Sequence, residues 1–242
     1  MHSQRKVPLT RIQKLIAHRM SASKRNKPCA YIESKADVTE LMALRPTLRK
    51  SLGVKITTNA FYIRSLAVAA ANYPLTVATL DESRPGNVLN IAQSINVGFA
   101  VNAPQGLVVP VVNSADKKSL AQIARLEKTL TEKARDNQLT LDQMEGETIA
   151  LSNLGAYDIE SFIGIVPPPT STILSVGNVI NTVVPHGRKP TVRKVVTLTV
   201  AFDRRVIGGD YAAQFLRFIV HQLQHPSKLI KEAHPRSAYR AN

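Results

Sequence analysis

Apolar residues recur at helical spacing near the start of the chain. Thr10 precedes them, and its hydroxyl can accept hydrogen bonds from the first free amides of a helix. The pattern predicts an amphipathic helix whose apolar stripe is formed by Ile12, Leu15, Ile16 and Met20. Tyr31 to Val38 then has the composition of a short strand.

Two more helices are expected before the middle of the chain. Asp37 or Thr39 can cap the first, and Pro46 should end or kink it; its apolar positions are Leu41, Met42 and Leu44. The second begins at Thr58 and stays apolar on nearly all sides to Ala71. Such a helix suits the centre of a core better than a surface.

The second half alternates strands with helices. Residues 94–101 and 107–112 are β-branched runs separated by turn-forming residues, which predicts a hairpin. Helical spacing follows over 120–130, and strands are expected at 148–152, 172–176 and 195–202. Asp210 can cap a last helix with one apolar stripe. Because the order lacks a regular βαβ rhythm, an α+β fold with a mixed sheet is preferred.

The 242 residues suit one domain spanning 1–242, and the low apolar content of 231–242 is typical of a disordered tail. Apolar residues make up 44%, but no run is long enough for a transmembrane helix, so no membrane partner is expected. The start does not resemble a secretory signal. Cys29 is the single cysteine, which forbids an internal disulfide and gives no metal cluster. These features suit the cytoplasm.

Basic residues outnumber acidic ones, 32 to 17, for a formal charge of +15. Such a charge attracts polyanions, including nucleic acid and phosphate-rich cofactors. No zinc-finger spacing and no aromatic-rich basic motif accompanies it, so a solvated basic face is favoured over a nucleic-acid site.

Four motifs, in order, resemble the catalytic core of the dihydrolipoamide acyltransferases of 2-oxoacid dehydrogenase complexes. They are Ile16-Ala17-His18-Arg19-Met20, then 96–101 with 106–111, then Leu151-Ser152-Asn153-Leu154-Gly155, and finally 202–209. The resemblance implies a chloramphenicol acetyltransferase-like fold. It also implies acyl exchange between dihydrolipoamide and coenzyme A, without a metal, at the interfaces of a trimer.

In this family the trimers often assemble into a cage, and lipoyl and peripheral-subunit-binding domains usually precede the core; neither domain is present in these 242 residues. The resemblance therefore implies a homotrimer, a larger cage, or a mixed core with an active acyltransferase, together with the other components of the complex. For a eukaryotic chain it implies the mitochondrial matrix in place of the cytoplasm.

Thioester exchange needs a base for the thiol and a donor for the oxyanion. The resemblance assigns the donor to Ser152, although a serine at a strand end can equally bond to backbone. The family motif Asp-His-Arg, two residues, Asp-Gly reads here with Arg204 at the histidine and Gly208 at the aspartate. An arginine stays protonated and cannot accept a proton, and glycine supplies no carboxylate.

Three further residues are expected to support the site: Arg19, Asn153 and Asp203. The resemblance makes Arg19 the partner of the missing aspartate. Because an unpaired buried cation is costly, Arg19 should lie in solvent or find another carboxylate, such as Asp203. Other bases are candidates only by residue type: His18, His186, His221 and His225.

Three hypotheses follow. The first is a catalytically impaired, core-forming subunit, similar in logic to the protein X components that lack the histidine. The second is an active acyltransferase with non-standard catalytic groups, in which Arg204 binds coenzyme A phosphates or stabilises a thiolate. The third is a basic scaffold that binds polyanions, with strong salt dependence.

Overall fold

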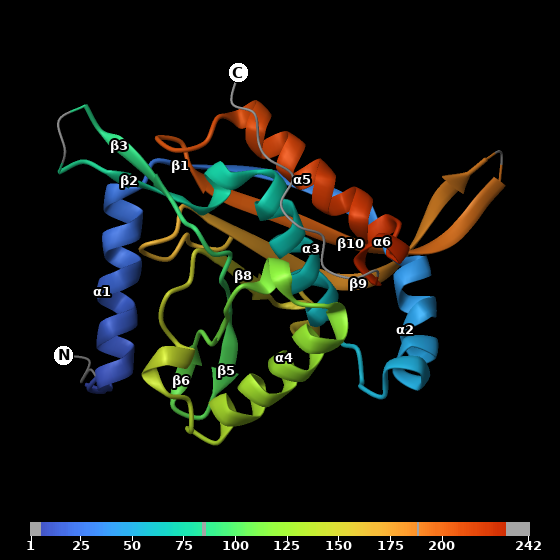
Figure 1. Ribbon diagram of the computed structural model, residues 1–242, viewed down its shortest axis with the longest axis horizontal. Coiled ribbons are helices and arrows are strands. Elements are labelled where there is room, and N and C mark those ends of the chain that lie inside the picture. Colours follow the sequence, from blue (N-terminus) through green and yellow to red (C-terminus); the bar gives the residue numbers. More distant parts are fainter. Residues whose placement is uncertain (1–5, 84–85, 188, 231–242) are drawn as a thin grey trace, which may run out of the picture.

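A mixed six-stranded sheet organises the computed structural model, which describes residues 6–83, 86–187 and 189–230 (Figure 1). The strand order is β1-β10-β9-β8-β4-β7. Pairing is antiparallel from β1 to β9, parallel from β9 through β8 to β4, and antiparallel from β4 to β7. The bounds are Cys29–Asp37 for β1, Val97–Phe99 for β4, Val111–Val112 for β7, Ile149–Asn153 for β8, Thr172–His186 for β9 and Lys189–Asp203 for β10. The expected α+β fold is confirmed.

Helices pack on one face of this sheet and enclose the main core. The central one is α3, predicted from its apolar run, with nearly every residue from Ala60 to Ala70 buried. It contacts α5 and α4, and α5 lies against β1 and β10. Helix bounds are Thr39–Leu52 for α2, Thr58–Asn72 for α3, Leu120–Arg135 for α4, Gly209–Gln224 for α5 and Ser227–Ile230 for α6.

The first helix stands at one end of the molecule (Figure 1). This is α1, Arg11–Asn26, and Thr10 caps it as predicted. Only Ser23 on α1 is buried, because the helix is anchored by polar bonds instead of an apolar face. Arg19, Ser23 and Lys27, spaced four residues apart on one face, donate to backbone carbonyls of the proline-rich segment 166–170.

The predicted hairpin is present but divided between two sheets. Val97–Phe99 pairs with Val111–Val112 in the main sheet, whereas β5 (Val101–Ala103) pairs with β6 (Gly106–Val108) in a separate ladder. Within the described residues, no helix is long and apolar enough to cross a membrane.

Several boundaries differ from the sequence expectations. β9 extends past the expected 172–176 to His186, and β10 begins at Lys189, before the expected 195–202. The added residues pair with one another and form a hairpin arm (Figure 1). This arm contains Pro185 and Pro190, and its positions alternate only between exposed and half-buried over 181–185 and 190–194, with none fully buried. A second hairpin, β2 (Ala78–Asp81) with β3 (Val88–Ile91), was not expected, because β3 is exposed throughout.

Two N-cap predictions were wrong, and the prediction that Pro46 ends or kinks α2 fails in its first alternative. Pro46 does not end α2, which continues to Leu52 because Leu48, beyond the proline, is buried in the core. Val38 is the N-cap of α2, while the Asp37 carboxylate accepts the amide of Thr39. Gly208, and not Asp210, caps α5. The tail expected at 231–242 lies outside the described residues.

Candidate active site

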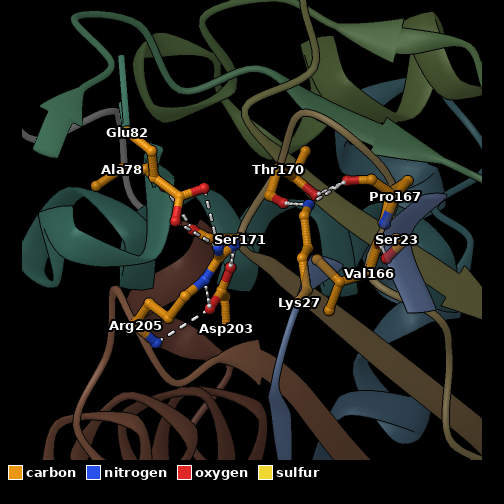
Figure 2. A network of polar contacts seen from close by, with 10 residues as sticks. All are labelled: Ser23, Lys27, Ala78, Glu82, Val166, Pro167, Thr170, Ser171, Asp203 and Arg205. Carbon is orange, nitrogen blue, oxygen red and sulfur yellow. Dashed lines mark hydrogen bonds and ion pairs between the residues drawn. The ribbon is translucent and has the colours of Figure 1, made fainter. Parts of the chain in front are cut away.

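The turn after β10 carries the degenerate motif. Asp203 is almost fully buried and accepts two hydrogen bonds from the Arg205 guanidinium, at 2.8 and 3.1 Å, and one from its amide at 3.0 Å. Arg205 also reaches Glu82 beyond β2 at 3.1 Å (Figure 2). The bond to Asp203 raises the pKa of Arg205 further above its ordinary value. Asp203 is therefore a structural anchor of the turn.

Arg204 points away from this anchor. Its guanidinium donates to the carbonyl of Ile207 at 3.1 Å, its amide donates to the carbonyl of Pro28, and the residue is exposed. Gly208 has a φ of −71°, which any residue adopts. A Cβ there would lie 2.8 Å from the Asp210 carboxylate, a flexible group that can turn aside.

Arg19 forms an ion pair with a carboxylate, but not with Asp203, the partner that the sequence suggested. Its guanidinium lies 3.0 Å from Glu147 and also donates to the carbonyl of Pro168. Glu147 is only 4% exposed in its side chain, and burial raises its pKa while Arg19 opposes that shift. The expectation of a new acidic partner is confirmed, but Asp203 was the wrong choice because Arg205 already occupies it.

Ser152 and Asn153 end β8 and face opposite sides of the sheet. Ser152 shares its face with Ala150, which packs with Val166, Ile173 and Ala201 away from the main helices. Asn153 lies on the helix side, accepts the amide of Gly155 at 2.9 Å and approaches Asn59 at 3.5 Å.

Within one chain, Ser152 and Arg204 do not meet. Ser152 is level with Ser175 on β9, which is level with Thr199 on β10. Arg204 lies five residues beyond Thr199, which places it roughly 16 Å along the strand and roughly 10 Å across two strand spacings. Hydrogen-bond reach is far shorter, so a site that uses both residues needs two copies of the chain.

Two cavities on the helix side were not foreseen. The first, of about 570 Å³, is lined by Asn153, Asn59, Glu127, Arg45 and Arg135 among others. Burial raises the pKa of Glu127, whereas hydrogen bonds from Thr57 and Asn59 lower it.

The second cavity, of about 580 Å³, shares Arg45 and is also lined by Arg49, Lys50 and Lys55, with no acidic residue in its lining. This cavity could have been anticipated from the basic residues Arg45, Arg49 and Lys50, which are spaced about four residues apart near the end of α2.

The candidate histidines do not gather at the motif. His18 is exposed on α1, and His186 ends β9. His221 and His225 stack edge to face at the far end of α5, with His221 roughly 18 Å along the helix from Gly209. The described residues contain no group of three side chains arranged to hold a metal ion.

Comparison with known proteins agrees with this fold. The model of the 2-oxoacid dehydrogenases acyltransferase (catalytic domain) matches residues 1–231. The acetyltransferase component of the Bacillus subtilis acetoin cleaving system is 32% identical over 228 residues, 93% of this chain and 56% of that protein. The mitochondrial pyruvate dehydrogenase protein X component of Mus musculus is 30% identical over 228 residues, 92% of this chain and 44% of that protein. The chain spans about half the length of the curated relatives it matches.

Solved structures give the same result. Azotobacter vinelandii dihydrolipoamide acetyltransferase, studied for the roles of a serine, a histidine and an asparagine in its mechanism, has a TM-score of 0.89 at 31% identity, with 95% of both chains covered. The cubic core of a pyruvate dehydrogenase multienzyme complex gives the same TM-score, identity and coverage. A chloramphenicol acetyltransferase, at 13% identity, TM-score 0.52 and coverage of 85% and 94%, shows the fold alone. The chain belongs to the 2-oxoacid dehydrogenase acyltransferase family and has the fold of its catalytic domain.

Proposed function

We propose that this protein is a core-forming subunit of a 2-oxoacid dehydrogenase complex whose own acyl transfer is impaired, as in protein X. The observation that carries the proposal is Arg204 at the position of the family's histidine. Its guanidinium donates to the carbonyl of Ile207, and an arginine side chain has no lone pair with which to accept a proton. A thiol that approaches this position meets a donor and no proton acceptor.

The single chain holds only half of the geometry that the family's reaction needs. The separation of Ser152 from Arg204 supports a trimer in which the serine end of one copy faces the motif turn of the next. Exposed apolar residues on the segment after β8 supply area for such contacts: Ile159, Ile163 and Ile165. The similarity to a cubic core supports assembly of trimers into a cage, either alone or mixed with an active acyltransferase.

A second candidate function is acyl transfer with non-standard groups. The four cations Arg45, Arg49, Lys50 and Lys55 line one cavity and match the phosphates of coenzyme A. The adjoining cavity shares Arg45 with it and reaches Asn153 on the helix side of the sheet, whereas the preceding Ser152 faces the other side. In this reading Ser152 donates to the oxyanion of the thioester exchange with dihydrolipoamide. Substrate binding then persists although no base stands at Arg204.

Charge and composition support the remaining proposals. A charge of +15 supports a polyanion-binding scaffold only if binding weakens steeply with salt. A single domain over 1–242 and a location in the cytoplasm or mitochondrial matrix are proposed on composition and on the family.

The test is coenzyme A-dependent acyl transfer to dihydrolipoamide by the protein and by its Arg204→His, Gly208→Asp double variant, at equal trimer content. We expect activity from the double variant and little from the original protein. Arg204→Gln, which removes the charge without adding a base, is the matched control and should stay inactive. Turnover by the original protein at the level of a competent relative would overturn the proposal.

A further inference from the structure

Two histidines that the proposed function does not use lie one helical turn apart where α5 ends, beside α6 (Figure 1). His221 is in the last turn of α5 and His225 is its C-cap. The amide of His225 donates to the carbonyl of His221 at 3.0 Å, which continues the helical pattern of hydrogen bonds. Both residues are exposed, and their rings lie 4.7 Å apart between centroids. The two imidazoles therefore leave the same face of the helix and reach each other.

Neither ring is committed to another group. In the part of the chain that the structure describes, neither imidazole hydrogen-bonds to a side chain or to a backbone carbonyl, so a lone pair of each ring is available. Among the described residues, the charged groups that act on His221 are Lys228 on α6, Arg217 on α5 and His225, and none of them is a carboxylate. A ligand at this place would be held by the two imidazoles.

The separation of the rings matches a metal chelate. A metal ion lies about 2.0–2.1 Å from a coordinating imidazole nitrogen, which places it roughly 3.2 Å from the ring centre. Two imidazoles at about 90–109° around one ion then have ring centres roughly 4.5–5.2 Å apart, and the observed 4.7 Å lies within this range. The rings meet edge to face at 61°, so chelation needs a rotation about χ2, a torsion that is soft in histidine and unhindered at an exposed position.

The chemistry of the pair selects the class of ion. Two imidazoles without a carboxylate suit Cu²⁺, Ni²⁺ and Zn²⁺, whereas Mg²⁺ and Ca²⁺ need oxygen ligands. The carbonyl end of α5 also favours a cation, because the helix dipole is negative there. Lys228 and Arg217 oppose the ion, so it should bind less tightly than in a site of three or four protein ligands.

We propose that His221 and His225 form a two-ligand site for a divalent transition-metal ion, with water completing the coordination. The ion joins the two side chains across the last turn of α5, just before the chain passes through Pro226 into α6. Binding stabilises the folded chain by mass action, since the unfolded chain does not hold the imidazoles at this spacing. The site lies roughly 18 Å along α5 from Gly209, so the proposal does not depend on acyl transfer at the motif turn.

The experiment measures the reaction of each histidine in the full chain with diethyl pyrocarbonate, by peptide mass spectrometry, at increasing Ni²⁺. His18, exposed on α1, is the internal reference. Because a metal-bound imidazole nitrogen cannot react, we expect the His221 and His225 rates to fall together, several-fold, at a Ni²⁺ concentration that leaves His18 unchanged. Mg²⁺ at the same concentration should change none of the three rates.

The variant His225→Asn separates chelation from binding to a single ring. Its His221 should need at least about tenfold more Ni²⁺ for the same protection, since the second imidazole no longer acts at high effective concentration. His18→Asn is the matched control and should leave the protection of the pair as it is.

Protection of His221 at an unchanged Ni²⁺ concentration in His225→Asn would overturn the proposal. Protection of the pair only at the concentration that also protects His18 would do the same. Should His225→Asn fail to fold, the comparison with His18 in the unmodified protein still decides. The outcome of the transfer assay does not bear on this result, which is scored on the two histidines themselves.

Discussion

Arg19 and Glu147 form an ion pair at 3.0 Å across 128 positions of sequence. The carboxylate is nearly inaccessible, whereas the guanidinium is 40% exposed, so the pair joins α1 to the loop before β8 at the edge of solvent. It supplies Arg19 with a carboxylate where the motif offers only Gly208.

Removing the cation should therefore be costly. Arg19→Met leaves Glu147 buried without its cation, and we expect the free energy of unfolding to fall by about 1–3 kcal/mol. Arg19→Met with Glu147→Gln should recover part of this loss. Denaturant unfolding of the single and double variants measures it, and equal losses in both would show that the pair itself contributes nothing.

The buried Asp203 carboxylate should need both guanidinium hydrogen bonds of Arg205 for the fold to keep its stability. Arg205→Lys loses the two parallel bonds to a buried carboxylate, and we expect about 3 kcal/mol of destabilisation. Arg204→Lys is the matched control, since Arg204 is exposed and donates only to the Ile207 carbonyl; it should change stability by less than about 0.5 kcal/mol. Similar midpoints for the two variants in urea would contradict this role for Asp203.

Glu127 should make stability depend on pH. Burial raises its pKa above the ordinary 4.5, so the folded chain keeps its proton to a higher pH than the unfolded chain. The unfolded state then binds fewer protons, and the free energy of unfolding falls as pH rises through the interval above 4.5. Glu127→Gln lacks this loss, so its stability relative to the original protein should increase as the pH rises above 4.5.

Unfolding curves at several pH values measure the difference. Glu132→Gln, at a side chain 59% exposed on the same helix, is the control and should run parallel to the original protein. Parallel behaviour of Glu127→Gln would mean that this carboxyl is not desolvated in the folded protein.

Gly177 permits the close approach of the segment after β8. A Cβ there would lie 1.9 Å from the carbonyl oxygen of Glu160, a backbone atom that cannot turn aside. Gly177→Ala should therefore cost about 3 kcal/mol or more. Gly208→Ala meets only the flexible Asp210 carboxylate and should be tolerated. Thermal unfolding compares the two, and a tolerated Gly177→Ala would show that the segment can shift.

The central helix and the motif turn could be predicted because each is written in contiguous residues. The apolar run of α3 predicts a buried helix, and residues 203–209 can be aligned with the family motif one by one. The β9–β10 arm and the β2–β3 hairpin could not, since few of their side chains are buried and apolar residues such as Val183 and Val192 occupy exposed positions of the arm. Propensity alone does not identify such strands.

The missed polar groups have a different cause. Glu147 as the partner of Arg19, and Glu127 beside Asn59, come from segments far apart in sequence. Lys27 reads as one more basic residue until its carbonyl partners at 166–170 are located. Burial of a charged residue follows from tertiary packing, and no local pattern reports it.

The most direct test of a missing base is the pH profile of residual acetyl transfer from acetyl-coenzyme A to dihydrolipoamide. Without a protein base, only thiol that is already ionised reacts, so the logarithm of the rate should rise linearly with slope one up to the pKa of the thiol. The Arg204→His, Gly208→Asp variant should instead level off near neutral pH, where histidine loses its proton. A plateau near neutral pH in the unmodified protein would contradict the account, because it would reveal a working base in a site that holds Arg204.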